Sequence, residues 1–175
     1  MATRKSAVRR ASDHVRAMSM LDRAEFRFRR FDEIGPLLEV LTGLCPAPET
    51  AAIGLSELLI NAVEHGNLGI SYADKRQLRL QNKWEDELAR RQELPEYRDR
   101  WVRVRVVRHD DHVEFGISDE GAGFDWRKYL EIDPERASDP NGRGIAMARM
   151  LSFESLEYRG SGSLVVVSVR TAATL

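Results

Sequence analysis

The stretch Glu57-Leu-Leu-Ile-Asn61-Ala-Val-Glu64-His65-Gly66 constrains the fold of this chain more than any other feature. It ends an apolar run that begins near Glu49, just after Pro48, and Gly66-Asn67 supplies a stop signal, so we expect one helix from Glu49 to Gly66. The apolar residues of this helix fall on one wide face, made by Leu55, Leu58, Leu59, Ala62 and Val63.

Three polar residues share another side of the same helix. Glu57, Asn61 and His65 fall at positions i, i+4 and i+8, which places a carboxylate, an amide and an imidazole on one ridge. Asparagine is a poor residue inside a helix, because its side chain competes for backbone hydrogen bonds. The ridge is either a solvated polar stripe or a metal and phosphate site, in which the amide binds Mg²⁺ and the carboxylate orients or deprotonates a nucleophile. The helix by itself leaves both interpretations open.

The composition indicates a single soluble domain of a reducing cytoplasm. The 175 residues include 42% hydrophobic residues, enough for a sizeable core. Lys plus Arg number 27 against 28 Asp plus Glu, so charge gives no reason to expect a nucleic-acid or membrane partner. The single Cys45 lies in an apolar setting and is expected to be a buried free thiol. No apolar stretch approaches the length that spans a bilayer.

The N-terminal part divides into a tail and the start of a domain. Residues 1–23 are basic and poor in apolar side chains, so we expect a mobile tail, and residues 24–175 form the single domain. Ala24 to Arg30 alternates like a half-buried strand. A helix from Asp32 to Thr42 follows, with Asp32 as the expected N-cap and Gly43 as the stop.

A charged insertion, residues 71–100, follows the central helix. Leu80, Trp84 and Leu88 recur every four residues, which predicts one amphipathic helix with a narrow apolar seam that stops before Pro95. This helix either lies over the protein's own core or forms a partner or dimer surface. Two hairpins are expected after it, one from Trp101–Val107 and His112–Ser118, the other from Glu154–Arg159 and Ser163–Arg170.

Two glycine boxes lie between these hairpins. Asp119-x-Gly121-x-Gly123 follows a strand, and Gly142-x-Gly144 opens a helix of Ile145, Met147, Ala148, Met150 and Leu151. Glycines let the backbone approach a ligand closely, and the free N–H groups at a helix start favour an anion such as phosphate. Neither box fits the dinucleotide fingerprint or the P-loop, and each alone is a weak signal.

Taken in order, these boxes resemble those of the GHKL, or Bergerat-fold, ATP-binding domains. The resemblance runs from about Ala24 to Arg170. It implies an α/β (α+β) two-layer sandwich, with a mixed, mainly antiparallel sheet of about five strands and helices on one face. It also implies ATP and Mg²⁺ as cofactors.

The resemblance assigns roles residue by residue. Glu57 takes the place of the general base, Asn61 that of the Mg²⁺ and phosphate ligand, and Asp119 that of the acceptor for the adenine amine. Residues 125–141 would form the lid over the triphosphate. The remaining expected nucleotide contacts are His65, the base-side residues Gly121, Gly123 and Phe124, the phosphate cradle Gly142, Arg143, Gly144 and Ile145, and Ser163 in the closing motif. The alternative role of His65 is to cap or pack near the helix end.

Within this group the chain looks most like the small anti-sigma-factor serine kinases. They transfer the γ-phosphoryl group of ATP to a serine or threonine of an antagonist protein, so the expected partner is an antagonist or sigma-factor-like protein, with a homodimer as an option. Histidine kinases need a phosphoaccepting histidine on a helical hairpin, and before the first strand this chain has only His14. The long insertion departs from compact anti-sigma kinases. The alternative is therefore a regulatory ATP/ADP-binding module or slow ATPase that docks a partner without phosphotransfer.

Overall fold

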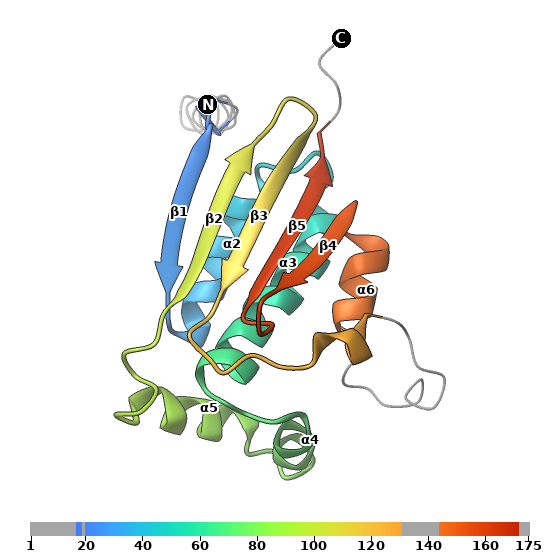
Figure 1. The fold of residues 1–175 in the computed structure, drawn as a ribbon. Coiled ribbons are helices and arrows are strands. Elements are labelled where there is room, and N and C mark those ends of the chain that lie inside the picture. Colours follow the sequence, from blue (N-terminus) through green and yellow to red (C-terminus); the bar gives the residue numbers. More distant parts are fainter. Residues whose placement is uncertain (1–16, 19, 131–143, 172–175) are drawn as a thin grey trace, which may run out of the picture.

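A computed structural model describes residues 17, 18, 20–130 and 144–171 (Figure 1). Most of the expected basic tail, including His14, lies outside these residues. The described elements are β1 (Arg23–Phe28), η1 (Phe31–Glu33), α2 (Ile34–Thr42), α3 (Pro48–Asn61), η2 (Ala62–Asn67), α4 (Tyr72–Leu80), α5 (Trp84–Glu93), β2 (Val102–Arg108), β3 (His112–Ser118), η3 (Trp126–Tyr129), α6 (Gly144–Leu151), β4 (Ser155–Arg159) and β5 (Leu164–Arg170).

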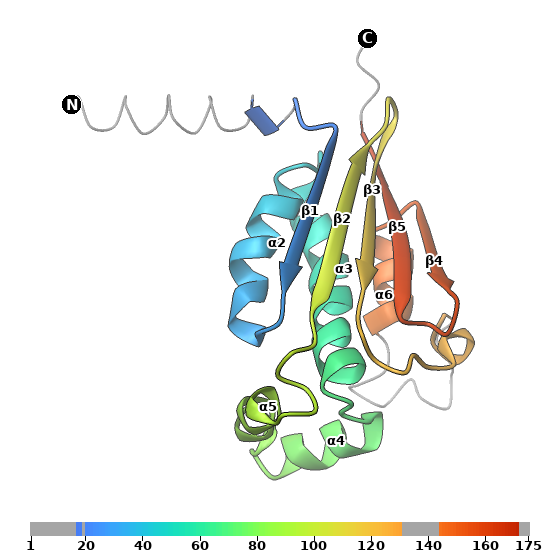
Figure 2. The same ribbon diagram turned by 60° about the vertical axis from the view of Figure 1, so that its left-hand side comes forward.

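The strands form one sheet in the order β1-β2-β3-β5-β4. Both expected hairpins are present, and β2 pairs with β3 so that Val104 lies opposite Ile117. Helices α2, α3 and α6 cover one face of this sheet (Figures 1 and 2), which confirms the predicted two-layer α+β sandwich. Among the five described strands every pairing is antiparallel, so the parallel pairing of a mixed sheet is not found there.

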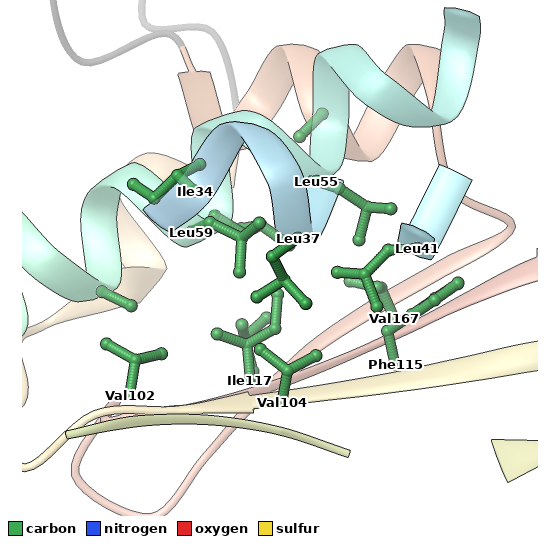
Figure 3. Packing of buried hydrophobic residues seen from close by; sticks show 14 of the residues in the cluster. Ile34, Leu37, Leu41, Leu55, Leu59, Val102, Val104, Phe115, Ile117 and Val167 are labelled. Atoms are coloured by element: carbon green, nitrogen blue, oxygen red, sulfur yellow. The ribbon is translucent and has the colours of Figure 1, made fainter. Parts of the chain in front are cut away.

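The core lies between the sheet and α2 and α3. Strand alternation buries Val102 and Val104 toward the helices, while Arg103 and Arg105 face outward. The predicted apolar face of the central helix packs against this sheet face and is buried along its length (Figure 3). Cys45 is buried and free as expected, and burial raises the pKa of its thiol to about 11.

The central helix differs from the expected single α-helix over Glu49–Gly66. The α-helical part ends at Asn61 and the chain continues as the π-helix η2, in which Leu68 N–H donates to Val63 O at 2.9 Å. Contacts from other elements fix this last turn: Asn67 Oδ1 accepts a 2.8 Å hydrogen bond from Glu120 N–H. A periodic pattern contains no information about such partners.

The expected N-cap Asp32 is also wrong. The chain first makes the 3₁₀ turn η1, and the carboxylate of Glu33 accepts hydrogen bonds from the N–H groups of Arg29 and Arg30 at 2.9 and 2.8 Å. Glu33 therefore takes the capping role, and Asp32 remains in the turn.

The insertion forms two helices where the sequence predicted one. Asn82 adopts a left-handed conformation with φ of 53°, which asparagine tolerates better than most residues, and it separates α4 from α5. The predicted seam is broken as a result: Leu88 is buried, but the Leu80 side chain is 71% exposed. Ser71 begins α4 with a capping box, since its Oγ accepts from Asp74 N–H at 3.1 Å. Both helices lie beyond the C-terminal end of α3 (Figure 2).

No helix of the described ranges is long and apolar enough to cross a membrane.

The fit of α3 against the segment after α6 predicts opposite effects for two glycine substitutions. A Cβ at Gly54 would lie 2.5 Å from Ser152 Cβ and 2.6 Å from the Phe153 ring, so Gly54→Ala should destabilise by about 1–3 kcal/mol through overpacking. Gly43 has a right-handed φ of −61°, so Gly43→Ala should stabilise by about 0.4–1 kcal/mol. Urea unfolding of both variants measures this. Equal effects would contradict the close packing of α3.

Candidate functional site

A cavity of about 620 Å³ opens between the C-terminal half of α3, the sheet, α4 and the start of α6. This volume is within the range of small-molecule binding sites, about 300–1,000 Å³. Its lining combines apolar residues with polar residues from five distant parts of the chain.

The predicted polar ridge faces this cavity. Glu57, Asn61 and His65 all line it and are half-buried. Within the part of the chain that the structure describes, the side chains of Glu57 and Asn61 make no hydrogen bond. The half-buried carboxylate and amide face the cavity without a partner among the described residues, so both are available to a ligand, as the metal and phosphate interpretation of the ridge requires.

Asp119 lies at the end of the cavity next to the turn of η2. Gly66 permits this approach, because a Cβ there would lie 2.6 Å from Asp119 Oδ1. Gly121 N–H donates to Asp119 Oδ1 at 2.8 Å, and a side chain at Gly121 would clash with the Gly66 carbonyl. The glycines of two separate motifs thus bring the central helix and the Asp119 box into contact.

Burial raises the pKa of Asp119 to about 6, while backbone hydrogen bonds and the charge of Arg100 act in the opposite direction. At neutral pH Asp119 is mainly an ionised acceptor in a partly desolvated site. Such an acceptor suits an amine donor on a ligand.

His65 is held in one tautomer. Its Nδ1–H donates to the Ile70 carbonyl at 2.5 Å. Burial lowers the pKa of His65, which favours the neutral ring with an unprotonated Nε2. His65 therefore stabilises the end of the central helix and also lines the cavity, so its expected contact with a nucleotide stays a prediction.

The start of α6 meets Glu57. A Cβ at Gly144 would displace the Glu57 carboxylate, so the glycine lets this carboxylate lie against the start of α6. Ile145 is buried on the cavity wall. Gly142, Arg143 and most of the expected lid lie outside the described residues, so their assigned roles remain predictions.

The other expected contacts fall on the same cavity. Gly123, Phe124 and Ser163 line it, and Gly123 has a left-handed φ of 78° close to the Ser161 carbonyl. Asp119 N–H donates to Ser163 O at 3.0 Å, which joins the Asp119 box to the closing motif.

Sequence reasoning missed Tyr158 and two basic residues of the cavity. Tyr158, together with Tyr129 of the expected lid, stacks edge-on against Phe124, with ring centroids 5.2 and 5.8 Å from that ring, and the three rings make an aromatic wall. Lys75 and Arg100 come from the insertion, whose position relative to the boxes no local pattern shows. The capping box of Ser71 and Asp74 is visible in the sequence and predicts where α4 starts.

The donor set fits a magnesium ion held mainly by substrate phosphates. In the described ranges no group of three His, Cys, Asp or Glu side chains could hold a metal by itself. Mg²⁺ keeps several waters and needs only one or two protein oxygens beside phosphates, a requirement that Asn61 meets.

The raised pKa of Asp119 predicts a pH-dependent gain in stability for Asp119→Asn without ligand. The folded-state pKa of about 6 exceeds the ordinary 3.8, so ionising Asp119 destabilises the fold progressively from about pH 4 to 6 and fully above. Asparagine keeps the acceptor for Gly121 N–H but has no charge. The variant should therefore melt higher than wild type at pH 7.5 and similarly at pH 4. Asp110→Asn, in the exposed β2–β3 turn, is the matched control. A melting difference independent of pH would contradict a buried charge.

Comparison with known proteins agrees with this geometry. The family model described as histidine kinase-like ATPase domain matches residues 45–170, which is more than half of the chain and includes every described residue of the cavity. No curated protein matches the chain. The sheet, the helices on one face and the order of the motifs agree with this match. The chain therefore belongs to the family of histidine kinase-like, GHKL-type ATPase domains.

Proposed function

We propose that this protein binds Mg·ATP in the cavity and transfers the γ-phosphoryl group to a serine or threonine of a regulatory partner protein, as anti-sigma-factor kinases do. The observation that carries the proposal is the placement of Glu57, a half-buried carboxylate without a partner in the described residues, against Gly144 at the start of α6. A carboxylate at that position is available to a hydroxyl group that attacks a phosphate held at the helix start.

Asp119 supports adenine as the base. Its carboxylate accepts a hydrogen bond from the exocyclic amine of adenine, whereas guanine presents a carbonyl oxygen at the corresponding edge. Gly66 and Gly121 leave the approach to this carboxylate free of side chains. Phe124, Tyr129 and Tyr158 provide apolar and aromatic surface at the same cavity.

Asn61 would hold Mg²⁺ through its amide oxygen. The bound ion supplies neutralising charge to the phosphates during transfer. Asn61 orients the triphosphate from the central helix, and the N-terminus of α6 faces it with the positive end of its helix dipole. Glu57, one turn before Asn61, accepts the proton of the attacking hydroxyl. Because phosphoryl transfer depends largely on positioning, the rigid spacing of these two residues on α3 suits the reaction.

Base choice gives the first prediction of this proposal. Wild type should prefer ATP over GTP, and Asp119→Asn should weaken ATP binding about ten- to a hundredfold, the value of one charge-assisted hydrogen bond. Titration calorimetry at pH 7.5 measures both. ATP affinity of the wild type should also fall below pH 6, as Asp119 becomes protonated. Equal affinity for ATP and GTP would contradict the role of Asp119.

A second prediction separates binding from chemistry on α3. Asn61→Ala should weaken Mg·ATP binding and thereby abolish turnover. Glu57→Gln keeps the shape but removes basicity, so it should bind Mg·ATP nearly as wild type while turnover falls about 10²–10⁴-fold.

The measurement pairs calorimetry with transfer of labelled phosphate from ATP to proteins of a cell extract. Glu49→Gln, an exposed glutamate in the first turn of the same helix, is the matched control. A Glu57→Gln variant with the wild-type rate would remove Glu57 from the chemistry. Wild-type ATP binding with no labelled protein, but with slow release of phosphate, would favour the ATPase or regulatory-module alternative.

A further inference from the structure

The 71–100 insertion forms part of the cavity wall. Tyr72, Lys75 and Arg79 lie on one face of α4 at helical spacing, and all three line the cavity. Tyr97 and Arg100, which follow α5, line it as well. The sequence suggested that this segment covers the core or binds a partner, but its α4 face points into the candidate nucleotide site.

Lys75 is the most deeply placed cation of this wall. It is 9% exposed, and its Nζ forms an ion pair with Oε2 of Glu64, which is fully buried in η2. The second carboxylate oxygen of Glu64 has no hydrogen-bond partner among the described residues. Removing two charges from water is costly and offers little net stabilisation when polar atoms stay unsatisfied. The ion pair joins α4 to η2 but contributes little net free energy to the stability of the fold.

The ion pair leaves Lys75 with capacity for a ligand. A lysine ammonium has three N–H donors, and within the described part of the chain Glu64 is the only side chain that accepts a hydrogen bond from Lys75 Nζ. Glu64 also holds the ammonium at the cavity, so that little side-chain freedom is left to lose on binding.

The insertion is anchored to the end of the central helix. Arg91 Nη1 donates to the carbonyls of Leu68 and Gly69 at 2.9 Å each, and Glu87 holds Arg91 at 2.7 Å. Arg100 Nη1 donates to Asn67 O at 3.0 Å. These bonds satisfy carbonyls at the end of η2 and tie the insertion to the site.

We propose that Lys75 binds the phosphate chain of the nucleotide, so that the insertion is a working part of the ATP site. This inference rests on the proposed function. The base-binding end of the cavity already has the anionic acceptor Asp119, whereas an ammonium requires an anionic or acceptor group. Phosphate oxygens are the anionic groups of the ligand and strong partners for lysine. Lys75 and Asn61 then face the same phosphate chain from two elements, α4 and α3.

The test compares ligands that differ only in their phosphates. Removing Lys75 alone would strand the buried Glu64 charge, so the principal variant is the double substitution Glu64→Gln with Lys75→Met, which removes both charges. Lys83→Met is the matched control, because Lys83 is an exposed lysine of the same insertion and does not line the cavity. Affinities for ATP, ADP, AMP and adenosine are measured with Mg²⁺ by calorimetry, with competition for weak ligands.

The proposal predicts a loss of affinity that depends on phosphate. The double variant should bind ATP about ten- to a hundredfold more weakly than wild type, the range of a charge-assisted hydrogen bond. Its adenosine affinity should stay unchanged, and Lys83→Met should resemble wild type with every ligand.

Three results would overturn the role of Lys75 while leaving ATP binding established. The first is unchanged ATP affinity in the double variant, and the second is an equal loss for ATP and adenosine, as expected of a purely structural ion pair. The third is a wild type that binds adenosine and ATP equally. Wild type that binds no adenine nucleotide would refute the proposed function itself, and the role of Lys75 with it.

Discussion

Burial of one side of α3 against the antiparallel sheet determines how the rest of the molecule is arranged. Leu55 and Leu59 are fully buried on the side of α3 that faces the sheet (Figure 3), so the helix cannot rotate without exposing them. With that side fixed, the ridge of Glu57, Asn61 and His65 must face the cavity. Gly66 and Gly121 then let the end of the helix touch the box after β3, and the polar ridge and Asp119 become two walls of one site.

Local pattern was enough to predict most strands and helices. Alternation in β2 and β3 predicted the hairpin, and the apolar face of α3 predicted its buried residues, because each depends on which side of an element is covered. The two-layer arrangement was predicted from the resemblance to the GHKL domains. The π-helix η2 was not predicted, since its last turn is held by a partner elsewhere in the chain, Glu120 N–H on Asn67. The break at Asn82 was not predicted either, although it is local: Asn82 adopts a left-handed conformation there. Leu80 shows the limit of spacing alone: it continues the period of Trp84 and Leu88 but lies on another helix, exposed.

The residues of the candidate site also fall into two groups, those that the sequence predicted and those that it did not. Residues within the motifs, such as Asn61, Asp119 and Gly144, could be named because the order of motifs resembles a known family, and all three line one cavity. Glu64 lies inside the central motif, but its burial could not be predicted from the sequence, because its ion-pair partner Lys75 comes from α4. The insertion, residues 71–100, thus adds a basic wall to the site. It also caps the end of the central helix with hydrogen bonds from Arg91 and Arg100. Tyr158 likewise reaches the site only through the pairing of β4 with β5.

The central claim is that Mg·ATP occupies this cavity with its base at Asp119 and its phosphates between α3 and α6. A crystal structure of the protein with Mg²⁺ and a non-hydrolysable ATP analogue tests it most directly. The account predicts the adenine amine within hydrogen-bond distance of the Asp119 carboxylate and an oxygen of Asn61 on the metal ion. An analogue bound with its base away from Asp119, or on the open face of the sheet, would contradict it.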